Sequence, residues 1–183
     1  VVLASGALSK DWGGGSPVTI CNTPGDGFYP SAAQDGVGGA LISWTEINLV
    51  STRTEIRVQR VNASGTSQWT ANGVVLVDSS VVGGSTLWQY GETTSTIASD
   101  GAGGAYAAWN DWRNDAATVG NDDMYAQRVN SSDNLVWTAN GVLLPPWIQG
   151  STAPGSQRNP QIVSDLVGGA VVTALAIAGW FAG

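Results

Sequence analysis

The chain has 183 residues, enough for one ordinary domain, with seven Lys and Arg against 14 Asp and Glu and a net charge of −7. A nucleic-acid interface needs clustered cations to neutralise phosphates, and this composition excludes it. The sequence has no histidine and one cysteine, Cys21, which excludes a Ser-His-Asp triad, a histidine-ligated zinc ion and a disulfide within the chain.

A short motif rich in glycine occurs three times at constant spacing. It reads DGVGGA at 35–40, DGAGGA at 100–105 and DLVGGA at 165–170, a step of 65 residues each time. Two further blocks recur with a step of 68 residues: QRVN at 59–62 and 127–130, and WTANGV at 69–74 and 137–142. Blocks in the same order at nearly constant spacing predict a repeat architecture.

These repeats divide the chain into four parts. We expect the end of a preceding repeat and a long loop at 1–28, repeat unit 1 at 29–93, repeat unit 2 at 94–158 and the start of unit 3 at 159–183. A closed propeller needs about four to eight such units. Because two complete units cannot close a ring, we expect the chain to be a piece of a longer protein or to assemble with further copies.

Each unit reads as four short strands in chain order. In unit 2 the first strand is 95–99, the DGxGG motif makes a turn because glycine adopts positive φ freely, and the second strand is 105–109. In unit 1 the third strand, Ile56–Val61, alternates in polarity, and the fourth lies around Trp69. No stretch shows a helical period of useful length.

This pattern predicts an all-β fold of antiparallel four-stranded units of about 65 residues, β-propeller-like but partial. A duplicated β-sandwich or a β-solenoid is the alternative. The C-terminal stretch Val167–Gly183 carries no charge and, at 17 residues with four glycines, is marginal for a membrane span. We interpret it as a buried strand, with an irregular pattern from Val171 onward because the tryptophan expected after Ala170 is missing.

The pattern D-G-x-G-G-A-x-x-x-W-x-[DE], followed by [DE]-[IM]-x-x-Q-R-V-N and W-T-A-N-G-V, resembles a repeat common in large secreted and cell-surface bacterial proteins. The likeness covers most of the chain between about Tyr29 and Ala170. Unit 1 departs from it with TEI at 45–47, where unit 2 has NDWR at 110–113. The resemblance implies a propeller-like fold and a secreted or surface location, and it says little about activity.

Acidic residues recur at equivalent positions on either side of the loop between the second and third strands: Glu46 and Asp111 before it, Glu55 and Asp123 after it. Two carboxylates about 5 to 10 Å apart can hydrolyse a glycosidic bond. Catalytic residues are normally unique in a chain, whereas these recur with the repeat. We therefore favour acid–arginine pairs that close each unit, with Arg60 and Arg128 as the arginines and no catalytic residue.

The loop of unit 2 between the second and third strands is rich in the oxygen ligands that calcium prefers. A calcium ion there would be held by Asp111, Asp115, Asp122 and Asp123. The spacing does not match an EF-hand, and Arg113 would oppose a cation, so a solvated acidic loop is the favoured reading. Calcium is the only cofactor that the sequence suggests.

Tryptophan is the most informative aromatic residue. Four tryptophans recur in register and are expected in the core between units: Trp44, Trp69, Trp109 and Trp137. Trp88, Tyr90 and Trp112 lie instead in segments that do not repeat. Exposed tryptophan and tyrosine stack on sugars or anchor protein interfaces, so these three residues are the candidates for contact with a ligand or partner.

These observations favour an extracellular, non-catalytic binding or scaffold module, part of a larger surface or secreted protein or an accessory subunit of a complex. Its expected partners are protein subunits or a glycan, and a membrane-spanning role is not expected. The periplasm is the alternative compartment. A carbohydrate-active domain, either a glycoside hydrolase or lectin-like, and a structural subunit of an extracellular filament are the alternative functions.

Overall fold

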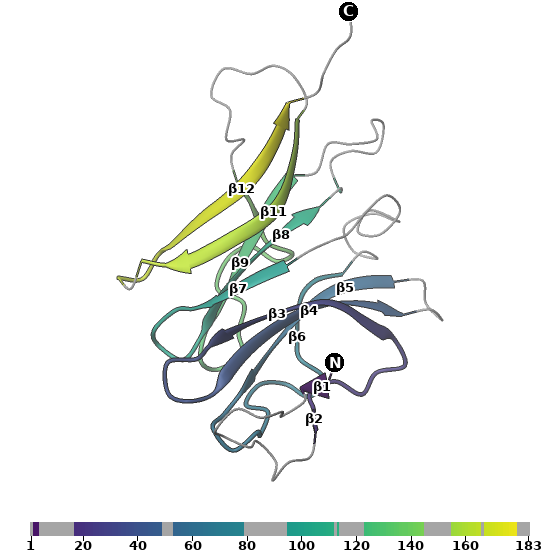
Figure 1. Cartoon of the computed structure of the whole chain (residues 1–183), viewed down its shortest axis with the longest axis vertical. Coiled ribbons are helices and arrows are strands. Elements are labelled where there is room, and N and C mark those ends of the chain that lie inside the picture. Colours follow the sequence, from purple (N-terminus) through teal and green to yellow (C-terminus); the bar gives the residue numbers. More distant parts are fainter. Residues whose placement is uncertain are drawn as a thin grey trace, which may run out of the picture.

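The structure is a computed structural model that describes residues 2–3, 17–48, 53–78, 95–111, 113, 123–144, 155–165 and 167–178. These residues form the strands β1 to β12 and no helix, which confirms the all-β prediction for this part of the chain (Figure 1). It contains no helix of the length and apolar character needed to cross a membrane.

Unit 1 forms a four-stranded antiparallel sheet in which each strand pairs with the next one in the chain. Its strands are β3 (Asp26–Gln34), β4 (Ala40–Asn48), β5 (Arg53–Val61) and β6 (Val74–Asp78). Side chains two residues apart on a strand point to the same face, and Ile56 and Val58 of β5 are accordingly both fully buried. The alternation seen in the sequence therefore marks a face of the sheet that packs in the core.

Unit 2 repeats the same order of strands, which confirms the antiparallel four-stranded units. Its strands are β7 (Ser95–Ser99), β8 (Ala105–Asp111), β9 (Asp123–Val129) and β10 (Val142–Leu143). Two antiparallel sheets of two strands each flank the two units: β1 (Val2–Leu3) with β2 (Val18–Thr19), and β11 (Gly155–Ser164) with β12 (Ala170–Ala178).

The fourth strand does not lie around Trp69, and that part of the prediction is wrong. The strand β6 begins only at Val74, because Asn72 (φ 66°) and Gly73 (φ 86°) adopt left-handed backbone angles that interrupt an extended chain. Trp69 lies in the connection before them, where its backbone N–H donates to Oε1 of Gln59 at 3.0 Å. Its side chain is nevertheless buried, as the repeat predicts.

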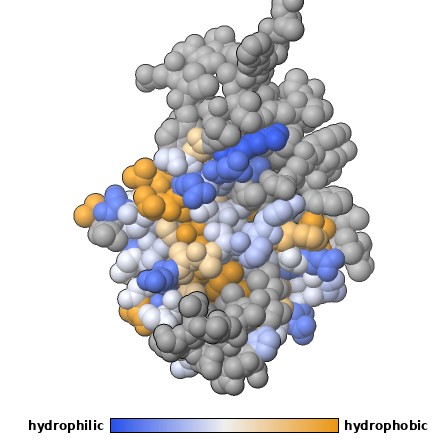
Figure 2. Space-filling model, viewed as in Figure 1, coloured by the Kyte–Doolittle hydropathy of each residue, from blue (hydrophilic) through white to orange (hydrophobic). Residues whose placement is uncertain are grey.

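The prediction for the C-terminal stretch is wrong on two points. The strand β12 is continuous from Ala170 to Ala178, so the pattern from Val171 onward is not irregular over these residues. Nor is the strand buried on both faces, since Val171 and its cross-strand partner Val163 are 54% and 59% exposed. Apolar atoms accordingly reach the surface beside the β11–β12 turn, at the left of Figure 2.

The sheets stack face to face in chain order, and each interface has its own apolar cluster (Figure 1). The cluster between units 1 and 2 contains Leu41, Ile56, Val58, Trp69, Leu76 and Val77 from unit 1, and Ile97, Ala105, Ala107, Trp109, Tyr125 and Val129 from unit 2. On the other face of unit 2, Tyr106, Ala108 and Ala126 pack with Ile162 of β11. Both faces of the second sheet are therefore in the core, and β8 is buried along its whole length.

Polar contacts also join the two sheets at defined points. The hydroxyl groups of Ser43 and Ser95 lie 2.9 Å apart in the buried interface. On the exposed side, Oδ2 of Asp133 accepts the backbone N–H of Thr70 at 2.9 Å and its hydroxyl at 2.6 Å. These bonds set the register of one unit against the next in a way that apolar packing alone does not.

The stacking predicts that equivalent core positions differ sharply in their effect on stability. Leu41 is fully buried between the two sheets, whereas Val171, two repeats later, is half exposed. Leu41→Ala should lower the free energy of unfolding by about 2–5 kcal/mol because it leaves a cavity. Val171→Ala, the matched control, should lower it by less than about 1 kcal/mol. Urea unfolding of the two variants measures the difference, and equal losses would contradict the stacking order.

Candidate functional site

The repeated aspartate organises the turn that follows it. Oδ1 of Asp100 accepts the backbone N–H groups of Ala102 and Gly104, each at 2.8 Å, and the N–H of Asp100 donates to the carbonyl of Gly104 at 3.1 Å. Asp35 and Asp165 make the same set of bonds in their own turns. One carboxylate oxygen thus closes each turn, which is why aspartate stands at this position of the repeat.

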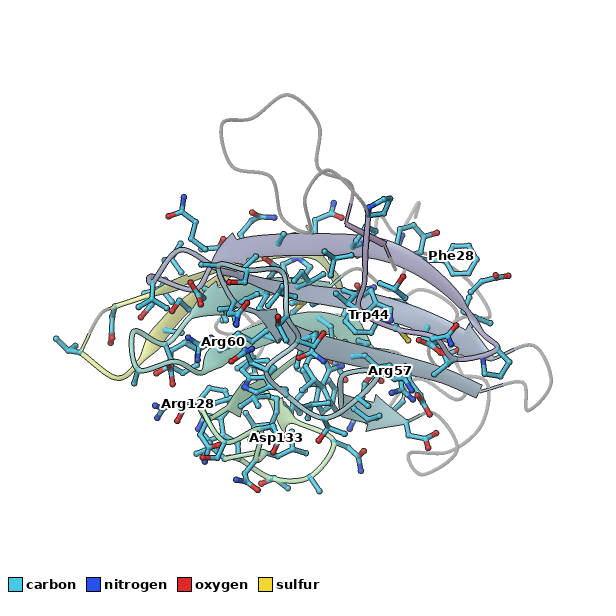
Figure 3. All side chains as sticks on the ribbon, turned by 90° about the horizontal axis from the view of Figure 1, so that it is seen from below. Phe28, Trp44, Arg57, Arg60, Arg128 and Asp133 are labelled. Atoms are coloured by element: carbon cyan, nitrogen blue, oxygen red, sulfur yellow. The ribbon has the colours of Figure 1, made fainter. Side chains whose placement is uncertain are left out.

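An arginine from the third strand donates to the second carboxylate oxygen of the aspartate. Nε–H and Nη2–H of Arg128 donate to Oδ2 of Asp100 at 3.1 and 2.8 Å, and the same groups of Arg60 reach Oδ2 of Asp35, both at 3.1 Å. Nη1–H of Arg60 also donates to the carbonyl of Gly103 in the next unit at 3.1 Å. Figure 3 shows Arg60 and Arg128 towards the same end of the stacked sheets. We call each aspartate–arginine pair the turn clamp.

The last glycine of the motif is required by the close approach of the third strand. A Cβ atom on Gly39 would lie 2.1 Å from the carbonyl oxygen of Val61, and one on Gly104 would lie 2.3 Å from that of Val129. No side chain fits at such distances from a backbone atom. The glycine therefore makes room for the strand that carries the arginine.

The turn clamps change the acidity of their carboxyl groups. Burial acts to raise the pKa of Asp35 and of Asp100, but bonds from the turn amides and from the arginines outweigh it, and both pKa values lie below the ordinary value. The bond to Asp100 raises the pKa of Arg128 in turn. Both clamps are therefore charged pairs in the folded protein at neutral pH.

A second pair of acids lies on β4 and β8, next to the tryptophans expected in the core. Nε1–H of Trp44 donates to Oε2 of Glu46 at 3.1 Å, and Nε1–H of Trp109 donates to Oδ2 of Asp111 at 3.2 Å. Residues two apart on a strand share a face, which places each acid beside its tryptophan. Both acids are buried, and Glu46 also accepts the thiol of Cys21 at 3.1 Å.

The arginine beside the buried acid of the second strand comes from a different part of the chain in each unit. In unit 1, Nε of Arg57 on β5 lies 3.8 Å from Oε2 of Glu46. In unit 2, Tyr125 stands at the position of Arg57, and Arg113 after β8 donates from Nε–H to Oδ2 of Asp111 at 2.9 Å. The guanidinium of Arg113 lies 3.8 Å from the centre of the Tyr125 ring. Each buried acid is thus balanced by an arginine, although not by the arginines of the QRVN blocks.

The register brings the predicted carboxylates together in pairs. Glu46 lies opposite Glu55 on neighbouring strands, and Asp111 lies opposite Asp123. Nε–H of Arg57 donates to Oε2 of Glu55 at 2.8 Å, so a cation lies beside both acids of unit 1. Carboxylates held by an internal arginine are poorly suited to protonate a leaving group or attack a sugar.

The calcium hypothesis concerns the same region. Asp115 and Asp122 lie outside the described residues, and the carboxylate of Asp111 is held by Arg113 and Trp109. Within the described part of the chain, no group of three or more His, Cys, Asp and Glu side chains could hold a metal ion. The pairing of Asp111 counts against a calcium ion at that residue.

The predicted aromatic residues differ in their surroundings. Trp44, Trp69 and Trp109 are buried, whereas Trp137 is half-buried and stacks on Tyr106 with ring centres 5.9 Å apart. The candidates for ligand contact lie outside the described residues: Trp88, Tyr90 and Trp112. Their role stays a prediction.

Sequence reasoning missed the role of the glutamine in the QRVN blocks. Gln59 is fully buried, and its amide Nε2–H donates to the carbonyl of Thr70 at 3.0 Å. Its Oε1 accepts the backbone N–H groups of Arg60 at 2.9 Å and of Trp69 at 3.0 Å. Gln127 makes the equivalent bonds in unit 2. A polar residue repeated within an apolar strand was the available signal.

Comparisons with protein-family models, with curated proteins and with solved structures found no match.

The turn clamps predict a specific loss of stability in acid. A carboxyl group whose pKa is lowered by folding stabilises the protein above its unfolded pKa of about 3.9, and this contribution disappears as the pH falls through the folded value. Asp100→Asn should lower the free energy of unfolding at pH 6, and the difference from the wild type should shrink towards pH 3. Denaturant unfolding across this range measures it.

Asp165→Asn is the matched control, because Asp165 makes the same turn bonds but has no arginine partner among the described residues. At pH 6, Asp165→Asn should therefore lower the free energy of unfolding by less than Asp100→Asn does. If the free energies of unfolding of the wild type and Asp100→Asn fall in parallel between pH 6 and pH 3, the charged clamp does not contribute the acid-sensitive stability.

Proposed function

We propose that this chain is a non-catalytic binding or scaffold module of the β-propeller type. The stacking of successive four-stranded sheets supports this reading. The first strands of the units, β3, β7 and β11, lie next to one another without pairing in one sheet, as the innermost strands of adjacent propeller blades do (Figure 1). The module would build part of a larger surface or secreted protein, or an accessory subunit of a complex.

The observation that carries the non-catalytic interpretation is that the repeated acids of β4 and β8 are buried and bonded within the protein. Glu46 and Asp111 are 4% and 0% exposed, and each carboxylate is bonded to a tryptophan and accompanied by an arginine. A general acid or nucleophile must reach the reacting atom of its substrate. Acids that are enclosed and neutralised from within the protein serve instead to anchor the strands that carry them.

The proposed location rests on the resemblance and on composition. The chain has a single lysine, Lys10, and a single cysteine, and its repeat resembles those of secreted and surface proteins of bacteria. We therefore place the module outside the cell or on its surface, with protein subunits or glycans as its partners.

A comparison of hydrolysis with stability tests this function. The wild-type chain should release no reducing ends from a panel of oligosaccharides and polysaccharides. The double variant Glu46→Gln with Asp111→Asn should lose about 1–3 kcal/mol of stability for each acid, because a half-buried arginine and a buried tryptophan N–H lose their charged partner. Asp26→Asn, at an exposed acid of β3, is the control and should be neutral. Hydrolysis by the wild type that the double variant lacks, with stability unchanged, would establish an enzyme instead.

A further inference from the structure

Three exposed side chains at the start of β3 form a candidate binding surface. Phe28 and Tyr29 are 40% and 37% exposed, with ring centres 6.2 Å apart and ring planes tilted by 42°. Asp26, two residues before Phe28, is exposed as well. Figure 3 shows Phe28 on the side of β3 away from Trp44 and Arg57. We call Asp26, Phe28 and Tyr29 the aromatic–acid surface.

The aromatic–acid surface lies beside the junction of the two complete units. Phe28 lies opposite Thr45, and residues opposite each other on paired strands share a face of the sheet. Ser43, two residues before Thr45, is on the same face, and its hydroxyl group contacts that of Ser95 in unit 2. The exposure of Phe28 is therefore that of a side chain next to a complete unit, and not that of an outer face of the stack.

The backbone at Tyr29 is strained for a tyrosine. The register of β3 against β4 shifts after Phe28, and within this bulge Tyr29 adopts a φ of 50°. The strand β11 has the same kind of bulge after Arg158, where the residue of positive φ is Asn159 (φ 53°). Asparagine adopts left-handed angles more readily than a bulky side chain does. Backbone stability alone favours asparagine in such a bulge, so an exposed tyrosine in its place points to a function.

The acid of this surface has no cation beside it in the described part of the chain. None of the hydrogen bonds and ion pairs of the described residues involves the carboxylate of Asp26. The arginines of these ion pairs are each bound by acids of their own unit: Arg57, Arg60, Arg113 and Arg128. The chain as a whole has a net charge of −7, which attracts cationic partners. The charge of the aromatic–acid surface is thus complementary to that of a cation.

Unit 2 shows how this fold combines an acid, an aromatic ring and an arginine. The guanidinium of Arg113 lies 3.8 Å from the centre of the Tyr125 ring, while its Nε–H donates to Asp111. The guanidinium of Arg128, which forms a turn clamp, lies 5.4 Å from the centre of the Tyr106 ring. A cation over an aromatic ring is attracted by the negative charge of the ring face. The aromatic–acid surface offers the rings and the carboxylate without an arginine from the described residues.

We propose that the aromatic–acid surface binds an arginine side chain of a partner polypeptide. The inference rests on the proposed scaffold function and names the chemistry of its partner. The guanidinium lies against the rings of Phe28 and Tyr29, and the carboxylate of Asp26 accepts its N–H groups. Side chains two residues apart on a strand share a face at a spacing of about 7 Å, which one guanidinium over the Phe28 ring can bridge. Arginine fits better than lysine, because a planar guanidinium stacks on a ring while its N–H groups donate sideways.

Two short capped peptides test the proposal on the full chain, one with an arginine between glycines and one with a glutamine in its place. Nuclear magnetic resonance of the isotope-labelled chain follows the backbone amides of Asp26, Phe28 and Tyr29. The arginine peptide should shift these amides in a saturable way. The glutamine peptide should bind about fivefold more weakly, because it lacks the charge that the rings and the carboxylate attract.

Three variants of the chain separate the surface from general charge attraction and from the fold. Asp26→Asn should weaken binding of the arginine peptide about threefold, because it removes the charged acceptor. Asp165→Asn makes the same change of net charge at another exposed acid and is the matched control, which should leave binding unchanged. Tyr29→Asn should also weaken binding about threefold. It should not lower the unfolding temperature, because β11 has asparagine at the same backbone conformation.

Absence of saturable shifts at the three amides would overturn the proposal, and so would equal binding of the two peptides. Equal effects of Asp26→Asn and Asp165→Asn would show that net charge alone attracts the peptide, which contradicts a site. A neutral oligosaccharide that shifts the same amides and that the arginine peptide does not displace would overturn the proposal in favour of a sugar. Glycan hydrolysis by the wild type would contradict the proposed function and leave the arginine site intact, so the two failures are distinct.

Discussion

The fold depends on one repeated interaction, the pairing of the turn aspartate with an arginine of the third strand. The aspartate divides its two oxygens between the amides of its own turn and the guanidinium, so a single carboxylate fixes the turn and the strand at once. Arg60 extends the same contact to the carbonyl of Gly103 in the next unit. Charge-assisted bonds at low exposure are strong enough to offset the cost of burying the charge only when every partner is in place, as it is here.

The clamp explains why the glycine-rich aspartate motif and the arginine recur together, although Asp35 and Arg60 lie 25 residues apart in the sequence. The glycine allows the third strand to approach, the aspartate receives its arginine, and the buried glutamine beside the arginine secures the loop that carries the tryptophan. Once a unit is closed in this way, both faces of its sheet are available for its neighbours. The alanines of β8 are small enough for sheets to pack on both sides of them.

Much of this arrangement could be predicted from the sequence, because the repeat itself reports the positions that must be kept. The 65-residue step located the strands on either side of each Asp-Gly turn, and alternation along Ile56–Val61 located a buried face. Contacts between segments could not be predicted in the same way. Trp69 is buried from a connection and not from a strand, and the cation beside the β4 acid comes from β5 whereas that of β8 comes from Arg113. Neither arrangement leaves a local sequence pattern, since the partners are distant in the sequence or occupy different positions in the two units.

The most direct test of the account is a double-mutant cycle on Asp35 and Arg60. Unfolding free energies of Asp35→Asn, Arg60→Gln and the double variant measure the energy by which the two side chains stabilise each other. The turn clamp predicts a coupling energy of about 1.5–3 kcal/mol, the range for a hydrogen-bonded charged pair of low exposure. Additive losses in the two single variants, with a coupling near zero, would contradict the claim that this pair holds the unit together.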